Sequence, residues 1–219
     1  MTVILCLETA TTNCSVAISD NGTIKSIREL NNRNYSHAEK LHVFIEEVLE
    51  ESEISKENLD AVAISKGPGS YTGLRIGVSA AKGLAFALDI PLISIPTLQV
   101  LAAQAKNQEG FIVPLIDARR MEVYSAVYDS DLKQIRGTRA EIVNEHSFQE
   151  FLDQKKTIFL GDGAQKFKEI CSHPNALFLT DKFPSSREMA SLATLKFKKS
   201  DIEDIAYFEP YYFKEFKTN

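Results

Sequence analysis

The sequence predicts a two-lobed α/β protein in which two β-meanders of similar plan are each continued by helices. Its 219 residues are enough for two small lobes with buried cores. The segments "LCLETATTNCSVAISD" and "PLIDARRMEVYSAVYD" align Glu8 with Asp117 and Ala17 with Ala126, at a constant offset of 117 minus 8, or 109 residues. In both segments an apolar run, an acidic residue, a polar turn and a returning strand follow one another. This pattern indicates a duplicated unit.

The first lobe is expected to open with three strands. Residues 3–19 contain two β-branched runs around a polar turn, and Asn21-Gly22 is a strong hairpin signal before "IKSIREL". A helix is expected over 36–52, where Ser36 and Glu39 form a capping box. Its apolar positions recur with helical spacing, at Leu41, Phe44, Ile45, Val48 and Leu49.

The remaining elements follow from alternating strand and helix patterns. "LDAVAIS" and "PLISI" predict strands, and a helix is expected from Thr72 to Leu88 and another over "TLQVLAAQAK". In the second half, "TIFLGDGAQKFKEI" predicts a strand, a glycine turn and a helix, "SREMASLATLKFKK" a helix, and "YFEPYYFKEF" an extended tail. We therefore expect an N-terminal lobe of residues 1–106 and a C-terminal lobe of residues 107–219.

Composition and charge narrow the class of protein. The net charge of −5 argues against a chain that binds nucleic acid without the help of a partner protein. No apolar run approaches the length of a membrane span, and no signal peptide precedes "TVILCLET", so a cytoplasmic protein is expected. Cys6, Cys14 and Cys171 are expected to be buried thiols, although Cys6 and Cys14 could face each other across a hairpin.

The glycine-rich stretch "KGPGSYTGLRIG" resembles a phosphate loop but lacks its spacing. Gly67, Gly69 and Gly73 fit neither the dinucleotide fingerprint nor the Walker pattern, and Pro68 removes one backbone donor. A phosphate site needs backbone N–H groups at fixed positions before a helix. These residues are therefore predicted to form a structural strand-to-helix connection.

The helix from Thr72 to Leu88 has apolar residues around most of its axis. Gly73 and Gly77 place small residues on one stripe, where a partner backbone could approach closely. A helix of this composition is buried on more than one side, so a second chain is expected to cover the side turned away from its own sheet. The alternative is burial entirely within this chain, beneath the first helix.

Classical catalytic patterns are missing or incomplete. His37 and His42, five residues apart, lie 140° apart on a helix and cannot chelate one ion, so no metal site is expected. Ser70 lacks the glycines of a hydrolase elbow. Glu8 and Asp117 occupy the places where a duplicated ATPase would keep carboxylates for metal and phosphate. Hydrogen bonds from the turn backbone to these acidic side chains would also explain their positions.

The motifs "LETAT", "GPGSYTGLRIG" and "IDARRMEVY", in this order, resemble the TsaB family of bacterial tRNA threonylcarbamoyladenosine biosynthesis proteins, formerly placed with the glycoproteases. The resemblance spans nearly the whole chain, and "PYYFK" is similar to a C-terminal Pro-x-Tyr-x-Arg motif with Lys214 in the Arg position. It implies the actin/Hsp70/sugar-kinase-like fold. Glu8 departs from the Asp of nucleotide-binding relatives, and Gly161 and Gly163 in "GDGA" resemble a remnant of an adenosine site.

The resemblance also implies a role. In that family the chemistry belongs to a paralogue, TsaD, which carries an H-x-x-x-H metal motif that this chain lacks and which transfers a threonylcarbamoyl group to N6 of an adenosine beside the tRNA anticodon. The implied role is a non-catalytic dimerisation subunit with no catalytic residues of its own. The implied partner surface lies on the two helices of the first lobe: His37, Leu41, Ile45, Thr72, Arg75, Ile76, Ser79, Ala80, Gly83 and Leu84.

Further partners and cofactors are expected on the same basis. A P-loop ATPase, TsaE, would dock on the pair, tRNA would be met only through the complex, and the isolated chain would form a homodimer. No cofactor is expected in the isolated chain, and ATP at most in the assembled complex. Two alternatives stay open: an ATP-dependent enzyme of the sugar-kinase class using Glu8, Asp117 and the Gly161–Gly163 turn, and a metalloprotease.

Overall fold

The computed structural model describes residues 1–32 and 37–213, which form two compact units. The first unit comprises residues 1–100 and the described residues from Pro184 onward, and the second comprises residues 101–183. Ser36, the predicted helix cap, and Lys214, the last residue of the tail motif, lie outside the described residues. No helix in the described part of the chain combines the length and the apolar character needed to cross a membrane.

The first unit is built on a five-stranded sheet with the order β3-β2-β1-β4-β5. The predicted meander forms β1 (Val3–Glu8), β2 (Asn13–Asp20) and β3 (Thr23–Asn31), which pair antiparallel. The strands β4 (Ala61–Ser65) and β5 (Leu92–Ile95) continue the sheet in parallel with β1. Asn21 and Gly22 both adopt positive φ, the conformation that a tight hairpin requires and that Asn-Gly accepts readily.

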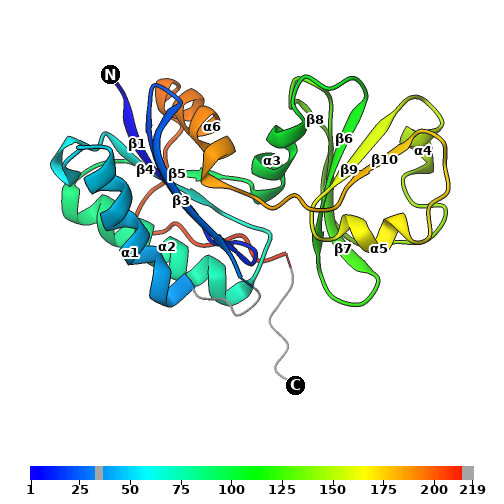
Figure 1. Cartoon of the computed structure of the whole chain (residues 1–219), viewed down its shortest axis with the longest axis horizontal. Coiled ribbons are helices and arrows are strands. Elements are labelled where there is room, and N and C mark those ends of the chain that lie inside the picture. Colours follow the sequence, from blue (N-terminus) through cyan, green and yellow to red (C-terminus); the bar gives the residue numbers. More distant parts are fainter. Residues whose placement is uncertain (33–36, 214–219) are drawn as a thin grey trace. The chain divides into compact units, whose positions relative to one another are not determined.

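Three helices cover this sheet. Helices α1 (His37–Glu51) and α2 (Tyr71–Leu88) pack on one face, and α6 (Ser186–Lys198) packs on the other (Figure 1). Strand alternation divides the core accordingly, because Leu5 and Leu7 join the α1–α2 cluster while Glu8, one residue on, projects to the opposite face. The short helix η1 (Lys56–Asn58) precedes β4, and α3 (Thr97–Ala102) and η2 (Ala103–Ala105) lead into the second unit.

The second unit repeats this plan. Its sheet has the order β10-β9-β6-β7-β8, with β6 (Phe111–Asp117), β7 (Glu122–Tyr128) and β8 (Gln134–Ile142) antiparallel and β9 (Thr157–Leu160) and β10 (Ala176–Leu179) parallel to β6. Helices α4 (Gln149–Leu152) and α5 (Ala164–Lys168) are short. Phe148, Phe151, Phe159 and Phe167 form much of the core. Counted along the chain, both sheets have the strand order 3-2-1-4-5, which confirms the predicted duplicated α/β fold.

The predicted boundary between the lobes is wrong in one respect. Residues 184–213 do not belong with the second unit, because α6 packs on β1, β2 and β5 of the first. Asn13 Nδ2 donates a hydrogen bond to the Pro184 carbonyl (3.0 Å), and the Ser15 hydroxyl contacts that of Ser186 (2.5 Å). The sequence pattern of α6 predicts a helix but does not specify which sheet it covers.

Candidate protein-interaction surface

The glycine-rich loop between β4 and α2 packs against the turn that follows β1. The amide of Ser70 donates to the Ala10 carbonyl (2.7 Å), and a Cβ at Gly69 would lie 2.3 Å from the same oxygen. Gly67 has a φ of +109°, and its peptide bond to Pro68 is cis. The Ser70 side chain accepts from the Gly73 amide (3.3 Å) and caps α2. The amides of Ser70 and Gly73 are therefore hydrogen-bonded within the chain.

The small-residue stripe of α2 is also used internally, contrary to expectation. A Cβ at Gly73 would lie 2.1 Å from the Thr9 carbonyl oxygen, and one at Gly77 would lie 2.2 Å from Thr9 Oγ1. The Thr9 hydroxyl donates to the Gly73 carbonyl (2.7 Å). The close backbone approach predicted for a partner chain is therefore made by the turn after β1.

Most of the circumference of α2 is covered within the first unit, and two of the covered sides face the sheet and α1. The side that includes Leu74, Val78 and Ala81 is buried against the sheet. One flank, with Ile76, Ala80 and Leu84, is half-buried against the same core as α1. The prediction that α2 is buried on more than one side is thus confirmed, and on this flank the cover comes from the chain's own α1, as the alternative prediction has it.

One side of α2 remains open, and we call it the helix face. At 100° per residue the exposed positions fall on a single arc. They are Thr72, Arg75, Ser79, Gly83, Phe86 and Ala87, bordered by the half-buried Ile76, Ala80 and Leu84. Phe86 is 79% exposed, and a Cβ at Gly83 would have no heavy atom within 4 Å. Four of the ten predicted interface residues, Thr72, Arg75, Ser79 and Gly83, lie on this face, and three more lie on its half-buried border.

The other three predicted interface residues are buried. His37, Leu41 and Ile45 of α1 point into the core and are at most 5% exposed. His37 Nε2 lies 2.8 Å from the Thr11 carbonyl, and burial lowers the pKa of this imidazole. These three residues, which the family resemblance implies as contacts, are therefore not on the surface of the first unit, because α1 turns the apolar stripe with Leu41 and Ile45 toward its own core.

The C-terminal segment from Glu203 to Phe213, which we call the strap, covers the other flank of α2 (Figure 1). The Lys82 ammonium donates to the Phe208 carbonyl (2.8 Å), and the Tyr211 amide donates to the Lys66 carbonyl (2.6 Å). Arg75 Nε donates to the Tyr212 hydroxyl (3.2 Å) while its guanidinium lies 4.2 Å from the Tyr71 ring centre. The hydrogen bond to Tyr212 raises the pKa of Arg75, so the guanidinium stays charged.

Glu8 ends β1 and is completely buried. Its carboxylate accepts from the Ala10 amide (2.7 Å) and from the Ser65 hydroxyl. Burial raises its pKa to about 7, although these hydrogen bonds favour the charged form. A carboxylate enclosed in this way is closed to the metal and phosphate of the predicted nucleotide site.

Asp117, Gly161 and Gly163 come together in the second unit. Lys166 Nζ lies 3.0 Å from Asp117 Oδ1, and the Asp117 amide donates to Asp162 (3.0 Å). A Cβ at Gly161 would lie 2.3 Å from the Leu115 carbonyl oxygen, and one at Gly163 would lie 3.0 Å from it, so both glycines permit close packing on β6. The geometry explains these glycines without a nucleotide.

The cysteines form no disulfide. Cys6 and Cys14 lie buried on β1 and β2, where burial raises the pKa of Cys6 to about 12 and that of Cys14 to about 11. Protonated, enclosed thiols are poor nucleophiles and poor metal ligands. Within residues 1–32 and 37–213, no three His, Cys, Asp or Glu side chains are placed to hold a metal ion together.

Comparison with known proteins identifies the family. The model of the TsaD family, tRNA N6-adenosine threonylcarbamoyltransferase, matches residues 31–218. The tRNA threonylcarbamoyladenosine biosynthesis protein TsaB of Escherichia coli K12 is 33% identical over 223 aligned positions, covering 96% of this chain and 94% of that protein. The chain belongs to the TsaB family.

Solved structures agree with this assignment. YeaZ from Pseudomonas aeruginosa is 26% identical to this TsaB-family chain and superposes with a TM-score of 0.86, covering 97% of this chain and 100% of that one. The activator of 2-hydroxyisocaproyl-CoA dehydratase from Clostridium difficile, solved with bound ADPNP, has a TM-score of 0.51 over 91% of this chain and 95% of its own, at 9% identity. This second likeness shows the fold alone.

Two features of this TsaB-family surface escaped the sequence analysis. Phe86 belongs to the helix face and carries a helical signal, because it follows Gly83 by three residues and Ser79 by seven. The strap was expected only as an extended tail. Its contacts with Lys82 and Arg75 join residues more than 120 positions apart, and no local pattern indicates them.

Proposed function

We propose that this TsaB-family chain is a non-catalytic subunit that binds and activates a TsaD-like paralogue, which transfers a threonylcarbamoyl group to N6 of the adenosine next to the tRNA anticodon. The binding surface is the helix face of α2. A TsaE-like ATPase docks on the resulting pair, and the isolated chain pairs with itself through the same surface. Contact with tRNA occurs through the complex.

The observation that carries the proposal is Gly83. A glycine inside a helix costs about 0.5–1 kcal/mol relative to alanine. At Gly73 and Gly77 this cost is offset, because the absence of a side chain lets Thr9 pack closely on the helix. At Gly83 no described residue has a heavy atom within 4 Å of the position that a Cβ would occupy. A partner backbone packed closely on the helix would account for Gly83, as small residues allow at other helix interfaces.

The neighbouring side chains suit such an interface. Phe86 supplies a large exposed ring, and Ile76, Ala80 and Leu84 add partly open apolar area. Arg75 is held by Tyr71 and Tyr212 at the rim, so less of its rotamer freedom would be lost on binding. The competing proposal of an independent ATP-dependent enzyme is weakened by the complete burial of Glu8.

A glycine substitution tests the proposal with two opposing readouts. In Gly83→Gln the helix gains propensity, so the melting temperature of the isolated chain should rise, while affinity for the TsaD-like paralogue, measured by calorimetry, should fall at least tenfold. Gly137→Gln is the matched control, because Gly137 is an exposed glycine of β8 that also has no atom near its missing Cβ. Unchanged affinity in Gly83→Gln would remove the helix face from the interface.

A charge placed on the border of the helix face gives a second test. Leu84→Glu should abolish co-elution with the paralogue, because the half-buried Leu84 can turn a longer polar side chain outward without entering the core. Ala81 of the same helix is fully buried and is not a suitable position for this test, because a charge there would unfold the first unit. Co-elution of a folded Leu84→Glu chain would contradict the proposal.

A further inference from the structure

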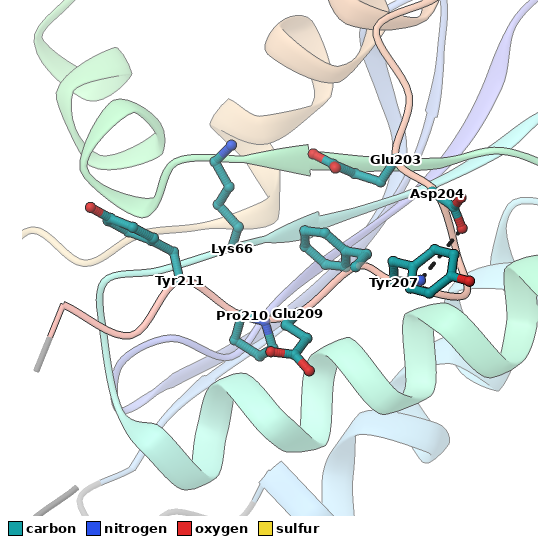
Figure 2. A pocket seen from close by; sticks show the side chains of 8 residues that line it. Lys66, Glu203, Asp204, Tyr207, Glu209, Pro210 and Tyr211 are labelled. Atoms are coloured by element: carbon teal, nitrogen blue, oxygen red, sulfur yellow. Dashed lines mark hydrogen bonds between the residues drawn. The ribbon is translucent and has the colours of Figure 1, made fainter. Parts of the chain in front are cut away.

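Arg119 and Arg120 lie at the tip of the hairpin between β6 and β7, and both side chains are exposed. In the part of the chain that the structure describes, neither guanidinium forms an ion pair, a hydrogen bond or a ring contact. The carboxylates beside the strap in Figure 2 differ in this respect, because Glu203 accepts from the Ser94 hydroxyl and Asp204 accepts from backbone amides. The two arginines are thus charged groups for which the described residues provide no partner.

The backbone conformation at this tip is unfavourable for arginine. Arg119 has a φ of +71° and Arg120 a φ of +52°, where a side chain crowds the backbone and glycine or asparagine is the usual residue. The hairpin between β2 and β3 follows this rule, because Asn21 and Gly22 occupy its positive-φ positions. Formation of the turn therefore does not explain why arginines stand at these two positions.

The equivalent turn of the first unit is covered by its own chain. Counted with the offset of 109 residues, Arg119 corresponds to Ala10 and Arg120 to Thr11. Ala10 and Thr11 are buried, and the Ala10 carbonyl accepts from the Ser70 amide of the glycine-rich loop. In the second unit the corresponding loop, after β9, packs on the end of β6 instead. This difference leaves the arginines exposed, so that they can meet another molecule.

The backbone beneath the arginines is held in place. Lys166 Nζ donates to the Arg120 carbonyl (2.5 Å) and to the Glu122 carbonyl (3.1 Å). The same ammonium lies 3.0 Å from Asp117 Oδ1, which also accepts from the Arg119 amide (2.5 Å). The nearby carboxylate is therefore engaged by the frame of the hairpin, and a fixed backbone lowers the entropy that the guanidinium groups lose when they bind.

We propose that Arg119 and Arg120 bind backbone phosphates of the tRNA when this chain is part of the complex, an inference that rests on the proposed function. A guanidinium donates two parallel hydrogen bonds to a phosphate and stays charged at any physiological pH. An acidic protein segment would offer carboxylates to the same groups, but the tRNA is the polyanion that the proposed reaction itself brings to the complex. Two contacts also suit a chain whose net charge of −5 gives it no general affinity for nucleic acid.

The test replaces both arginines by residues that suit the turn. Arg119→Asn combined with Arg120→Gly removes two charges and fits the positive φ values, so the melting temperature of the isolated chain should not fall. The complex of this double variant with the TsaD-like paralogue should bind an unmodified tRNA transcript, with adenosine next to the anticodon, about fivefold or more weakly. The slope of log affinity against log salt concentration should become shallower by about 1 to 2, because two phosphate contacts are lost.

A charge-matched control is available in the same unit. Lys106 and Lys133 are exposed and lie at the opposite end of the β6–β7 hairpin, just before β6 and just after β7. Lys106→Gln combined with Lys133→Gln removes the same charge and should leave the tRNA affinity of the complex unchanged. Affinity for the paralogue, measured by calorimetry without tRNA, should be the same in both double variants and in the wild type.

Four results would overturn the inference. Undiminished tRNA affinity in the arginine variant would place the hairpin tip away from the RNA, and equal weakening by the lysine control would show a general effect of charge. Weaker pairing of the arginine variant with the paralogue would assign the arginines to a protein contact. A lower melting temperature would show that the chain itself needs them. Failure of the wild-type chain to pair with the paralogue would instead contradict the proposed function, and with it this inference.

Discussion

Glu8 is a carboxyl group without contact to solvent, and its pKa of about 7 links the stability of the first unit to pH. The folded chain holds this proton more tightly than the unfolded chain, whose carboxyl titrates near 4.5. The stabilising contribution is therefore complete below pH 4.5 and is lost as the pH rises to about 7. The shift corresponds to roughly 3 kcal/mol.

Glu8→Gln should abolish this dependence. The amide can accept from the Ala10 amide and donate to Ser65 without a charge, so the variant should be more stable than the wild type at pH 8 by about 1–3 kcal/mol. Urea unfolding at pH 5 and pH 8 measures the difference, with the exposed Glu109→Gln as control. If Glu8→Gln and the wild type lost the same stability between pH 5 and pH 8, Glu8 would not be the group responsible.

Two glycines of one helix should respond oppositely to the same change. Gly77→Ala places a methyl group 2.2 Å from Thr9 Oγ1 and 2.9 Å from Ile64 Cδ1, and overpacking of this kind costs about 1–3 kcal/mol. Gly83→Ala meets nothing and should stabilise the chain by about 0.5–1 kcal/mol. Thermal unfolding of the two variants settles the matter, and a loss of stability in Gly83→Ala would mean that Gly83 is constrained within the chain.

At the scale of elements, the buried ring of Phe208 is the main apolar anchor of the strap, beside its hydrogen bonds to Lys66, Arg75 and Lys82. Phe208 joins the α1–α2 core, so Phe208→Ala should destabilise the first unit by about 3–4 kcal/mol. The adjacent Tyr207→Ala removes an exposed ring and should stay within about 0.5 kcal/mol of the wild type. Equal effects in chemical denaturation would contradict the anchoring role of Phe208.

The elements themselves were largely predictable from the sequence. The meander, α1, α2 and α6 carry strong periodicity or turn signals, and α2 begins at Tyr71, one residue before the predicted Thr72. The sequence "QIRGTRAEI" of the edge strand β8 shows no apolar/polar alternation, because its buried position is Arg136 while Ile135 and Ile142 are exposed. The predicted helix over "TLQVLAAQAK" is shorter, since α3 ends at Ala102 and the 3₁₀-helix η2 follows.

The proposed interaction surface was predictable only in part. Periodicity separates the two sides of a helix but does not tell which elements cover its flanks, and on α2 these are α1 and the strap. His37, which the family resemblance implies as a contact residue, is instead enclosed, because its ring nitrogen lies 2.8 Å from the Thr11 carbonyl. Both errors arise from contacts between segments distant in sequence.

At the scale of the whole molecule, the two units share a strand order but differ in the surroundings of equivalent residues. Glu8 and Asp117 end the first strands of sheets with the same strand order, yet Glu8 is buried while Asp117 is exposed and paired with Lys166. The internal repeat in the sequence was sufficient to predict the shared plan. The return of α6 to the first sheet was not predictable, because a repeat of continuous lobes places that helix in the second.

A reconstituted modification assay tests the central claim, that this chain assists catalysis without performing it. Threonylcarbamoyladenosine in tRNA would be quantified by mass spectrometry with the TsaD-like paralogue, the TsaE-like ATPase and the threonylcarbamoyl adenylate, with and without this chain. The account predicts no product from this chain alone, full product from the complete mixture, and a loss of at least tenfold when Leu84→Glu replaces the wild type. Product formed by this chain in the absence of the paralogue would contradict it.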